Sequence, residues 1–222
     1  MEQLYIPDDG DRQRFRISIP RGSYISHAFT RFVAQLDAQR DIDVNLHETN
    51  SMQTMASVSS GHADLGIIRY QLDYESYFLD YLREKGLRHE PIWEFEYLAL
   101  MSRAHPLADA QSVAYEKLQQ YVELVHGDTV VPYLPTDKLR KSDAKKRIYV
   151  YERGSQFDIL SHIPSTYMWV SPIPDSFLEL YGLVQRKCPA AHHKYKDQLI
   201  YPDGYAFTEL DRRFIDLLFA SK

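Results

Sequence analysis

The fold is decided by residues 15–69, which read FRISIPRGSYISHAFTRFVAQLDAQRDIDVNLHETNSMQTMASVSSGHADLGIIR. Three short apolar runs predict strands, at 15–19, 42–46 and 63–68. Two segments with helical spacing lie between them. One begins near Ile25, and the other follows the N-cap residues Asn50 and Ser51 and stops at Gly61. In a right-handed βαβαβ unit the carboxyl ends of the parallel strands meet at one edge, where ligands bind. The stretch therefore predicts an α/β fold with a small-molecule crevice.

The composition is that of an ordinary soluble protein. The chain has 222 residues, of which 44% are hydrophobic and 26% are charged. A net charge of −5 argues against a surface dedicated to phosphate backbones. The single cysteine, Cys188, cannot form an internal disulfide and fits a reducing compartment. Since no signal-like segment or long apolar run is present, we expect a cytoplasmic protein that does not enter a membrane.

The alternation of strands and helices resumes beyond residue 103. The turn Arg103–Pro106 is the candidate hinge, and strands are expected again at 121–125, 147–151, 166–170 and 194–201. The simplest organisation is two α/β lobes with a ligand cleft between them. The expected divisions are an N-terminal extension at 1–12, lobe I at 13–103, lobe II at 104–196 and a return to lobe I at 197–222.

The order of these features resembles a known family. The resemblance is carried by the segments FRISI (15–19), IDVNL (42–46), GHADLGII (61–68), WEFEYLALM (93–101), HPLA (105–108), AFT (206–208) and FIDLL (214–218). Their order and spacing resemble the effector-binding domain of LysR-type transcriptional regulators, which has the fold of type 2 periplasmic binding proteins. The resemblance implies a small-molecule effector between the lobes and assembly as a homodimer or tetramer. It implies neither catalysis nor a cofactor.

Two features depart from the family pattern. The segment 73–85 has helical spacing where the family usually has a short loop, so it looks like an insertion. The family's N-terminal winged helix-turn-helix is missing, because residues 1–14 are too few to form one. Any contact with DNA would then be made through that absent domain. Either the DNA-binding half belongs to a longer chain, or the protein senses without binding DNA itself.

Candidate effector contacts in the first lobe follow its strands. Ser23 and Tyr24 lie where the first helix begins, and the unpaired N–H groups of a helix N-terminus suit a carboxylate or phosphate. Asn50, Ser51 and Met52 occupy the equivalent place at the second helix, and Arg69 follows the third strand with a guanidinium that could bind an anion. Each has a structural alternative: helix capping for Ser23 and Ser51, and a surface or interlobe salt bridge for Arg69.

Candidate contacts in the second lobe also follow strands: Asp128, Thr129, Arg153, Ser155 and Ser171. The aromatic helix at 73–85 could be a lid or a subunit interface, but ordinary core packing is the preferred interpretation, because the helical spacing demands only that. No metal-binding spacing, nucleophile elbow or phosphate-binding glycine loop occurs in the sequence.

The leading hypothesis is therefore a ligand-sensing domain of a LysR-type regulator that binds an anionic metabolite. The alternative is a solute-binding protein of a transport system, which shares the fold but needs an export signal. An enzyme on a related two-lobed fold is a third class, and it would need an identifiable acid, base or metal set.

Overall fold

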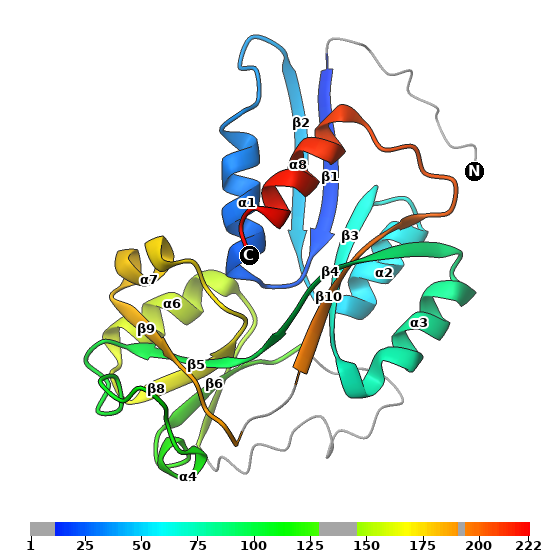
Figure 1. Cartoon of the computed structure of the whole chain (residues 1–222). Coiled ribbons are helices and arrows are strands. Elements are labelled where there is room, and N and C mark those ends of the chain that lie inside the picture. The colour runs from blue at the N-terminus through cyan, green and yellow to red at the C-terminus, as the bar shows by residue number, and fades with distance from the viewer. Residues whose placement is uncertain (1–11, 129–145, 191–193) are drawn as a thin grey trace.

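The computed structural model describes residues 12–128, 146–190 and 194–222. Within these residues the chain forms two five-stranded sheets, each covered by helices (Figure 1). The predicted α/β fold with two lobes is confirmed. One lobe contains both the first strands and the last helix of the chain, so the polypeptide leaves this lobe once and returns to it.

The first sheet has the order β2-β1-β3-β10-β4. Its parallel part is the predicted βαβαβ unit, and it comprises β1 (Arg12–Ile19), β2 (Asp41–Glu48) and β3 (Leu65–Gln71). Two antiparallel strands extend it, β10 (Lys194–Pro202) against β3 and β4 (Leu87–Glu96) against β10. Strand β3 is buried along most of its length, as expected for a parallel strand covered on both faces.

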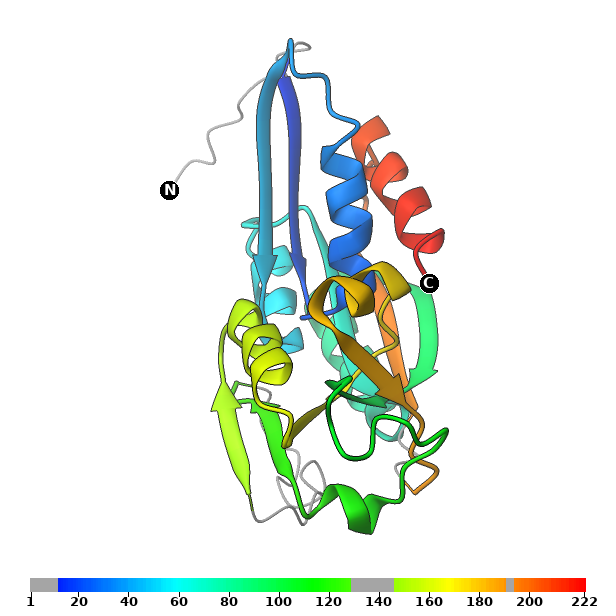
Figure 2. The same cartoon turned by 90° about the vertical axis from the view of Figure 1, so that its left-hand side faces the viewer.

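Helices cover both faces of this sheet. On one face lie α1 (Ser23–Val33) and α8 (Glu209–Phe219), side by side in both views (Figures 1 and 2). On the other lie α2 (Ser51–Ser59), the short η1 (Leu72–Tyr74) and α3 (Glu75–Glu84). Helix α8 begins with a capping box, in which Thr208 accepts from the Asp211 N–H and Asp211 accepts from the Thr208 N–H.

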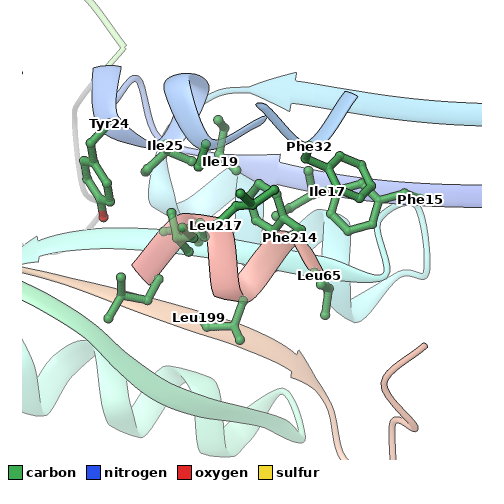
Figure 3. Close-up of a cluster of buried hydrophobic side chains, with 14 residues drawn as sticks. Phe15, Ile17, Ile19, Tyr24, Ile25, Phe32, Leu65, Leu199, Phe214 and Leu217 are labelled. Carbon is green, nitrogen blue, oxygen red and sulfur yellow. The ribbon is translucent and has the colours of Figure 1, made fainter. Parts of the chain in front are cut away.

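Aromatic rings hold the first face together. Phe214 of α8 is fully buried, and its ring centroid lies 5.2 Å from that of Phe15 and 5.8 Å from that of Phe32 (Figure 3). Phe15 and Phe32 lie 4.6 Å apart. The tilted and edge-on arrangements are those that aromatic pairs prefer. The last helix is thus fixed to the first strand and the first helix.

On the opposite face of the first sheet, the packing of α2 requires a glycine in β3. A Cβ added at Gly66 of β3 would lie 2.8 Å from side-chain carbons of Thr54, Val58 and Ile200. Helix α2 therefore packs so closely on β3 that no larger residue fits at this position without a shift of its neighbours.

The second sheet has the order β7-β6-β8-β5-β9. Its strands are β6 (Val122–His126), β7 (Arg147–Val150), β8 (Thr166–Val170), β5 (Leu98–Ser102) and β9 (Leu183–Arg186). Its helices are α4 (Tyr115–Leu118), α6 (Arg153–His162) and α7 (Asp175–Tyr181). Strand β6 is parallel to both β7 and β8, whereas β5 is antiparallel to both of its neighbours, β8 and β9. Strand β9 has only four residues and was not predicted from the sequence.

The chain crosses between the lobes earlier than expected. Strand β4 ends at Glu96 in the first sheet and β5 begins at Leu98 in the second, so the crossing point is Tyr97. The expected hinge at 103–106 instead lies inside the second lobe, where the Arg103 N–H donates to Gly182. On the return, β10 begins at Lys194, which places 194–196 in the first lobe. The lobe boundaries expected at 103 and 196 therefore do not coincide with the positions at which the chain passes from one sheet to the other. Turn residues mark a change of chain direction and not a change of sheet.

Replacement of Phe214 by alanine should lower the free energy of unfolding by about 3–5 kcal/mol, because it empties a ring-sized space that three elements enclose. Urea denaturation followed by circular dichroism measures this loss. Phe219→Ala on the same helix is the matched control, since Phe219 is 44% exposed, and it should cost less than about 1 kcal/mol. Equal losses for the two variants would show that α8 is not fixed through Phe214.

Candidate functional site

The lobes meet where parallel strands of both sheets end. Figure 2 shows the arrowheads of β1 and β2 pointing toward the second lobe and that of β7 pointing toward the first. Five residues just after or at these strand ends form what we call the interlobe junction: Arg21, Ser23, Glu48, Asp128 and Arg153. Carboxyl ends of parallel strands are the usual place of ligand sites in such sheets.

An ion pair with two hydrogen bonds joins the lobes at this junction. Arg21 follows β1, and its Nη1 and Nη2 donate to Oδ1 and Oδ2 of Asp128 at 2.8 and 2.9 Å. The Arg21 side chain is only 11% exposed. The predicted effector residue Asp128 is therefore engaged by a guanidinium from the opposite lobe.

Arg153 makes the second connection between the lobes. It is the first residue of α6, its Nη2 donates to Oγ of Ser23 at 3.2 Å, and its Nη1 lies 3.5 Å from Oε1 of Glu48. Its guanidinium carbon lies 5.3 Å and 5.7 Å from the ring centroids of Phe157 and Phe177. The Nε of Arg153 is buried and has no hydrogen-bond partner within the described residues. A buried donor without a partner is costly, so this guanidinium is incompletely satisfied.

Two helix N-termini add positive potential to the junction. The N-cap residues Gly22 of α1 and Glu152 of α6 make no side-chain capping bond, and neither helix has an acidic residue in its first turn. The expectation that Ser23 caps α1 is wrong, because Ser23 is the first helical residue and its hydroxyl accepts from Arg153. First-turn N–H groups without a capping side chain favour an anion.

Arg69 is paired within the first sheet. Its Nε and Nη2 donate to the two carboxylate oxygens of Asp197 on β10, both at 2.7 Å. Both side chains are buried, at 9% and 0% exposure. Burial alone would lower the pKa of Arg69, but the adjacent Asp197 carboxylate outweighs burial and raises that pKa above its ordinary value. The pair lies within the first sheet, so it is neither a surface nor an interlobe salt bridge.

Tyr24 and Gly22 complete this buried network. The Tyr24 hydroxyl donates to Oδ2 of Asp197 at 2.5 Å. Burial and the neighbouring Asp197 charge raise the pKa of Tyr24 well above its ordinary value, so its hydroxyl stays protonated and remains a donor. A Cβ added at Gly22 would lie 2.9 Å from Nη2 of Arg69, so the backbone approaches the guanidinium closely. The network thereby fixes the first turn of α1, including Ser23.

The remaining predicted residues divide into structural and surface positions. Ser51 donates to the Arg69 carbonyl at 2.7 Å and accepts from the Arg69 N–H at 2.9 Å, while Asn50 caps α2 through Gln53. Met52 packs partly buried against the core beneath α2 and α3. Ser155 is exposed and Ser171 is buried. Thr129 lies outside the described residues.

Arg21, Glu48 and Asp197 were not predicted as site residues. No local signal marked Asp197, because its neighbours in the chain, Lys196 and Gln198, are also polar. Arg21 and Glu48 lie in segments recognised as a turn and a strand end. Their partners come from the other lobe, so nothing in the local pattern distinguished them.

His126 and Gln156 lie in the second lobe beside the junction. Burial, together with the positive charge of Arg21, lowers the pKa of His126 to about 4, against a smaller opposing effect of Asp128. Gln156 of α6 is 4% exposed. The imidazole is therefore neutral at pH 7.

A hollow on the surface of the protein lies away from the junction. It is lined by Leu98, Asp109, Ala110, Gln111, Gln185, Arg186 and Lys187, beside β5 and β9, with a volume of about 460 Å³. Arg186 is already engaged there, since its Nε donates to the Ala108 carbonyl at 2.7 Å. The hollow is lined by none of the five junction residues.

Neither a metal centre nor a membrane span emerges from the described part of the chain. Its histidine, cysteine and acidic side chains form no group of three suited to a metal ion. None of its helices combines the length and apolar character needed to cross a bilayer.

The family model described as "LysR substrate binding domain" matches residues 8–220. The chain belongs to this family. A search of curated proteins found no significant relative by sequence. This LysR substrate-binding domain is therefore the effector-sensing domain of a transcriptional regulator, and the alternative of a transport solute-binding protein is not supported.

Solved structures show the same fold at low sequence identity. The effector-binding domain of QuiR in complex with shikimate has a TM-score of 0.61 and 15% identity, covering 94% of this chain and 96% of that one. The regulatory domain of MetR from N. meningitidis has a TM-score of 0.61 and 12% identity, covering 94% and 93%. A sulfate-bound mutant regulatory domain of OxyR2 from Vibrio vulnificus has a TM-score of 0.63 and 10% identity, covering 95% and 97%.

Asp197→Asn should lower the free energy of unfolding of this LysR domain by about 3 kcal/mol or more, because it leaves the buried Arg69 charge without its counter-ion. Urea denaturation gives the value. Asp203→Asn is the control, because Asp203 pairs with Arg88 at the surface, where the side chains of Arg88 and Asp203 are 69% and 72% exposed. This substitution should lower the free energy of unfolding by less than about 1 kcal/mol. A small loss for Asp197→Asn would mean that the network does not hold β3 to β10.

His126 should make the domain less stable in acid. The unfolded chain takes up a proton near the ordinary histidine pKa of about 6.5, whereas folded His126 takes it up only near pH 4. Between these values the unfolded state binds more protons, so stability falls as the pH falls. From pH 7 to 4.5 the wild type should lose about 2 kcal/mol more than His126→Gln in urea titrations. His162→Gln, at an exposed position, should follow the wild type. Parallel pH profiles for His126→Gln and the wild type would contradict a neutral buried imidazole.

Proposed function

We propose that the interlobe junction is the effector site and that the effector carries a carboxylate or a similar anion. Arg153 is the observation that carries this proposal. It crosses from the second lobe to Ser23, yet its buried Nε has no partner among the described residues. The first turns of α1 and α6 converge on the same place without side-chain caps. A bound anion would satisfy both the guanidinium and the helix N-termini.

Effector binding at this place is suited to signalling. The side chains that would hold the anion already connect the lobes, through Arg153 to Ser23 and through Arg21 to Asp128. An effector that takes over these groups favours one relative arrangement of the lobes. The change is a population shift, and its size is limited by the difference in affinity between the two arrangements.

The other predicted contacts are assigned supporting roles in this proposal. Tyr24, Ser51 and Arg69 hold the strand ends in place through hydrogen bonds with Asp197 or with the backbone. Asn50, Met52, Ser155 and Ser171 stay candidate contacts at the surrounding strand and helix ends. We propose no catalytic residue.

Two of the solved structures support the choice of an anion. QuiR was solved with shikimate and OxyR2 with sulfate, and both molecules are anions at neutral pH.

Homo-oligomer assembly belongs to the same proposal. Among the described residues β7 is an edge strand of its sheet, and its Ile148 side chain is 39% exposed.

A thermal-shift panel of small carboxylates at pH 7 tests the site. An effector should raise the melting temperature in proportion to the logarithm of its concentration. Arg153→Gln should weaken binding by roughly tenfold to a hundredfold, because a charged hydrogen bond is lost. Arg213→Gln is the control on α8, where Arg213 pairs only with Glu209 and the Gln35 carbonyl in the described structure. Equal affinity in both variants would exclude Arg153 as the anion contact.

A further inference from the structure

The carboxylate of Glu48 distinguishes between classes of anionic effector. Resting on the proposed function, we propose that the effector is a zwitterion of the α-amino acid type, whose carboxylate binds Arg153 and whose ammonium group binds Glu48. The inference comes from the weak contact between these two side chains and from the charges around them.

Glu48 is the last residue of β2, and its side chain is 24% exposed. Its contact with Arg153 is 3.5 Å long, in contrast to the paired bonds of 2.8 and 2.9 Å between Arg21 and Asp128. Burial raises the pKa of Glu48 in spite of the attraction of Arg153 and Arg21, with a further contribution from Glu152. Glu48 is thus a partly desolvated carboxylate with incomplete compensation.

An effector that carries only a negative charge would reduce the compensation of the Glu48 carboxylate further. Its carboxylate would take the Arg153 guanidinium, and Glu48 would lose the cation that it contacts. A partly buried charge without a partner is strongly unfavourable, so simple anions are penalised. Arg21 also attracts Glu48, but its guanidinium is shared with the Asp128 carboxylate, so it compensates Glu48 only in part.

A zwitterion avoids this loss. Its carboxylate replaces Glu48 at Arg153, and its ammonium group replaces Arg153 at Glu48, so each protein charge keeps an opposite charge beside it. The charged side chains at this place are those of two cationic residues, Arg21 and Arg153, and of three anionic residues, Glu48 itself, Asp128 and Glu152. This balance accommodates a positive group together with a negative one. Because the ligand would lie between Arg153 and Glu48, binding would also exchange a direct interlobe contact for one through the effector.

The test compares three forms of one compound on the wild-type domain. The twenty L-amino acids are screened by thermal shift, and each hit is measured by calorimetry beside its desamino acid and its methyl ester. The amino acid should bind, whereas removal of the ammonium group or of the carboxylate charge should each weaken binding by roughly tenfold or more.

Glu48→Gln assigns the ammonium contact. This substitution should lower the affinity for the amino acid by roughly tenfold to a hundredfold. It should change the affinity for the desamino acid by no more than a few-fold. Glu116→Gln, exposed on α4, is the control and should leave both affinities unchanged.

Tighter binding of desamino acids than of amino acids would overturn the zwitterion while leaving the anion site of the proposed function in place. Amino-acid binding that Glu48→Gln does not weaken would overturn the role of Glu48. An absence of binding in both the amino-acid and the carboxylate panels would overturn the inference together with the proposed function.

Discussion

The buried ion pair between Arg69 and Asp197 is the constraint on which the rest of this domain depends. It joins β3 to β10, the strand by which the chain returns from the second lobe. Tyr24 donates to the same carboxylate, so the first turn of α1 is bound to the pair as well. An uncompensated charge at this depth would be strongly destabilising, and therefore the strands and the helix must keep their positions together. The place of Ser23 at the interlobe junction follows from this arrangement.

The structure separates two arginines that had similar predicted roles. Arg69 is neutralised by an acidic residue of its own sheet and has a structural function. Arg153 crosses to the other lobe, stacks near two phenylalanine rings and retains a buried nitrogen without a partner in the described chain. Of these two arginines, Arg153 has a buried side-chain nitrogen without a partner among the described residues, and Arg69 does not. The difference lies in the quality of compensation, since both guanidinium groups are largely buried.

The same principle connects binding to signalling in this LysR domain. The described contacts between the lobes include charged hydrogen bonds, from Arg21 to Asp128 and from Arg153 to Ser23, and an edge-on contact between the rings of His27 and Phe177, whereas each lobe has its own apolar core. Polar contacts can be exchanged for contacts with a ligand at little net change, whereas a core cannot be opened without exposing apolar surface. In the function that we propose, an effector would therefore alter the angle between the lobes while each lobe keeps its internal packing.

The sequence by itself determined the fold class, the order of nearly all strands and helices, and the family. Apolar periodicity and capping residues such as Asn50 and Thr208 act over a few positions in the chain. The helices and strands that they specify can therefore be predicted from the local sequence. The crossing at Tyr97, the strand β9 and the partners of the charged side chains were decided only by the tertiary structure. Asp197 is 128 residues from Arg69, and Asp128 is 107 residues from Arg21. Which charges neutralise each other, and which stay available to an effector, depends on contacts that form only when the sheets are assembled.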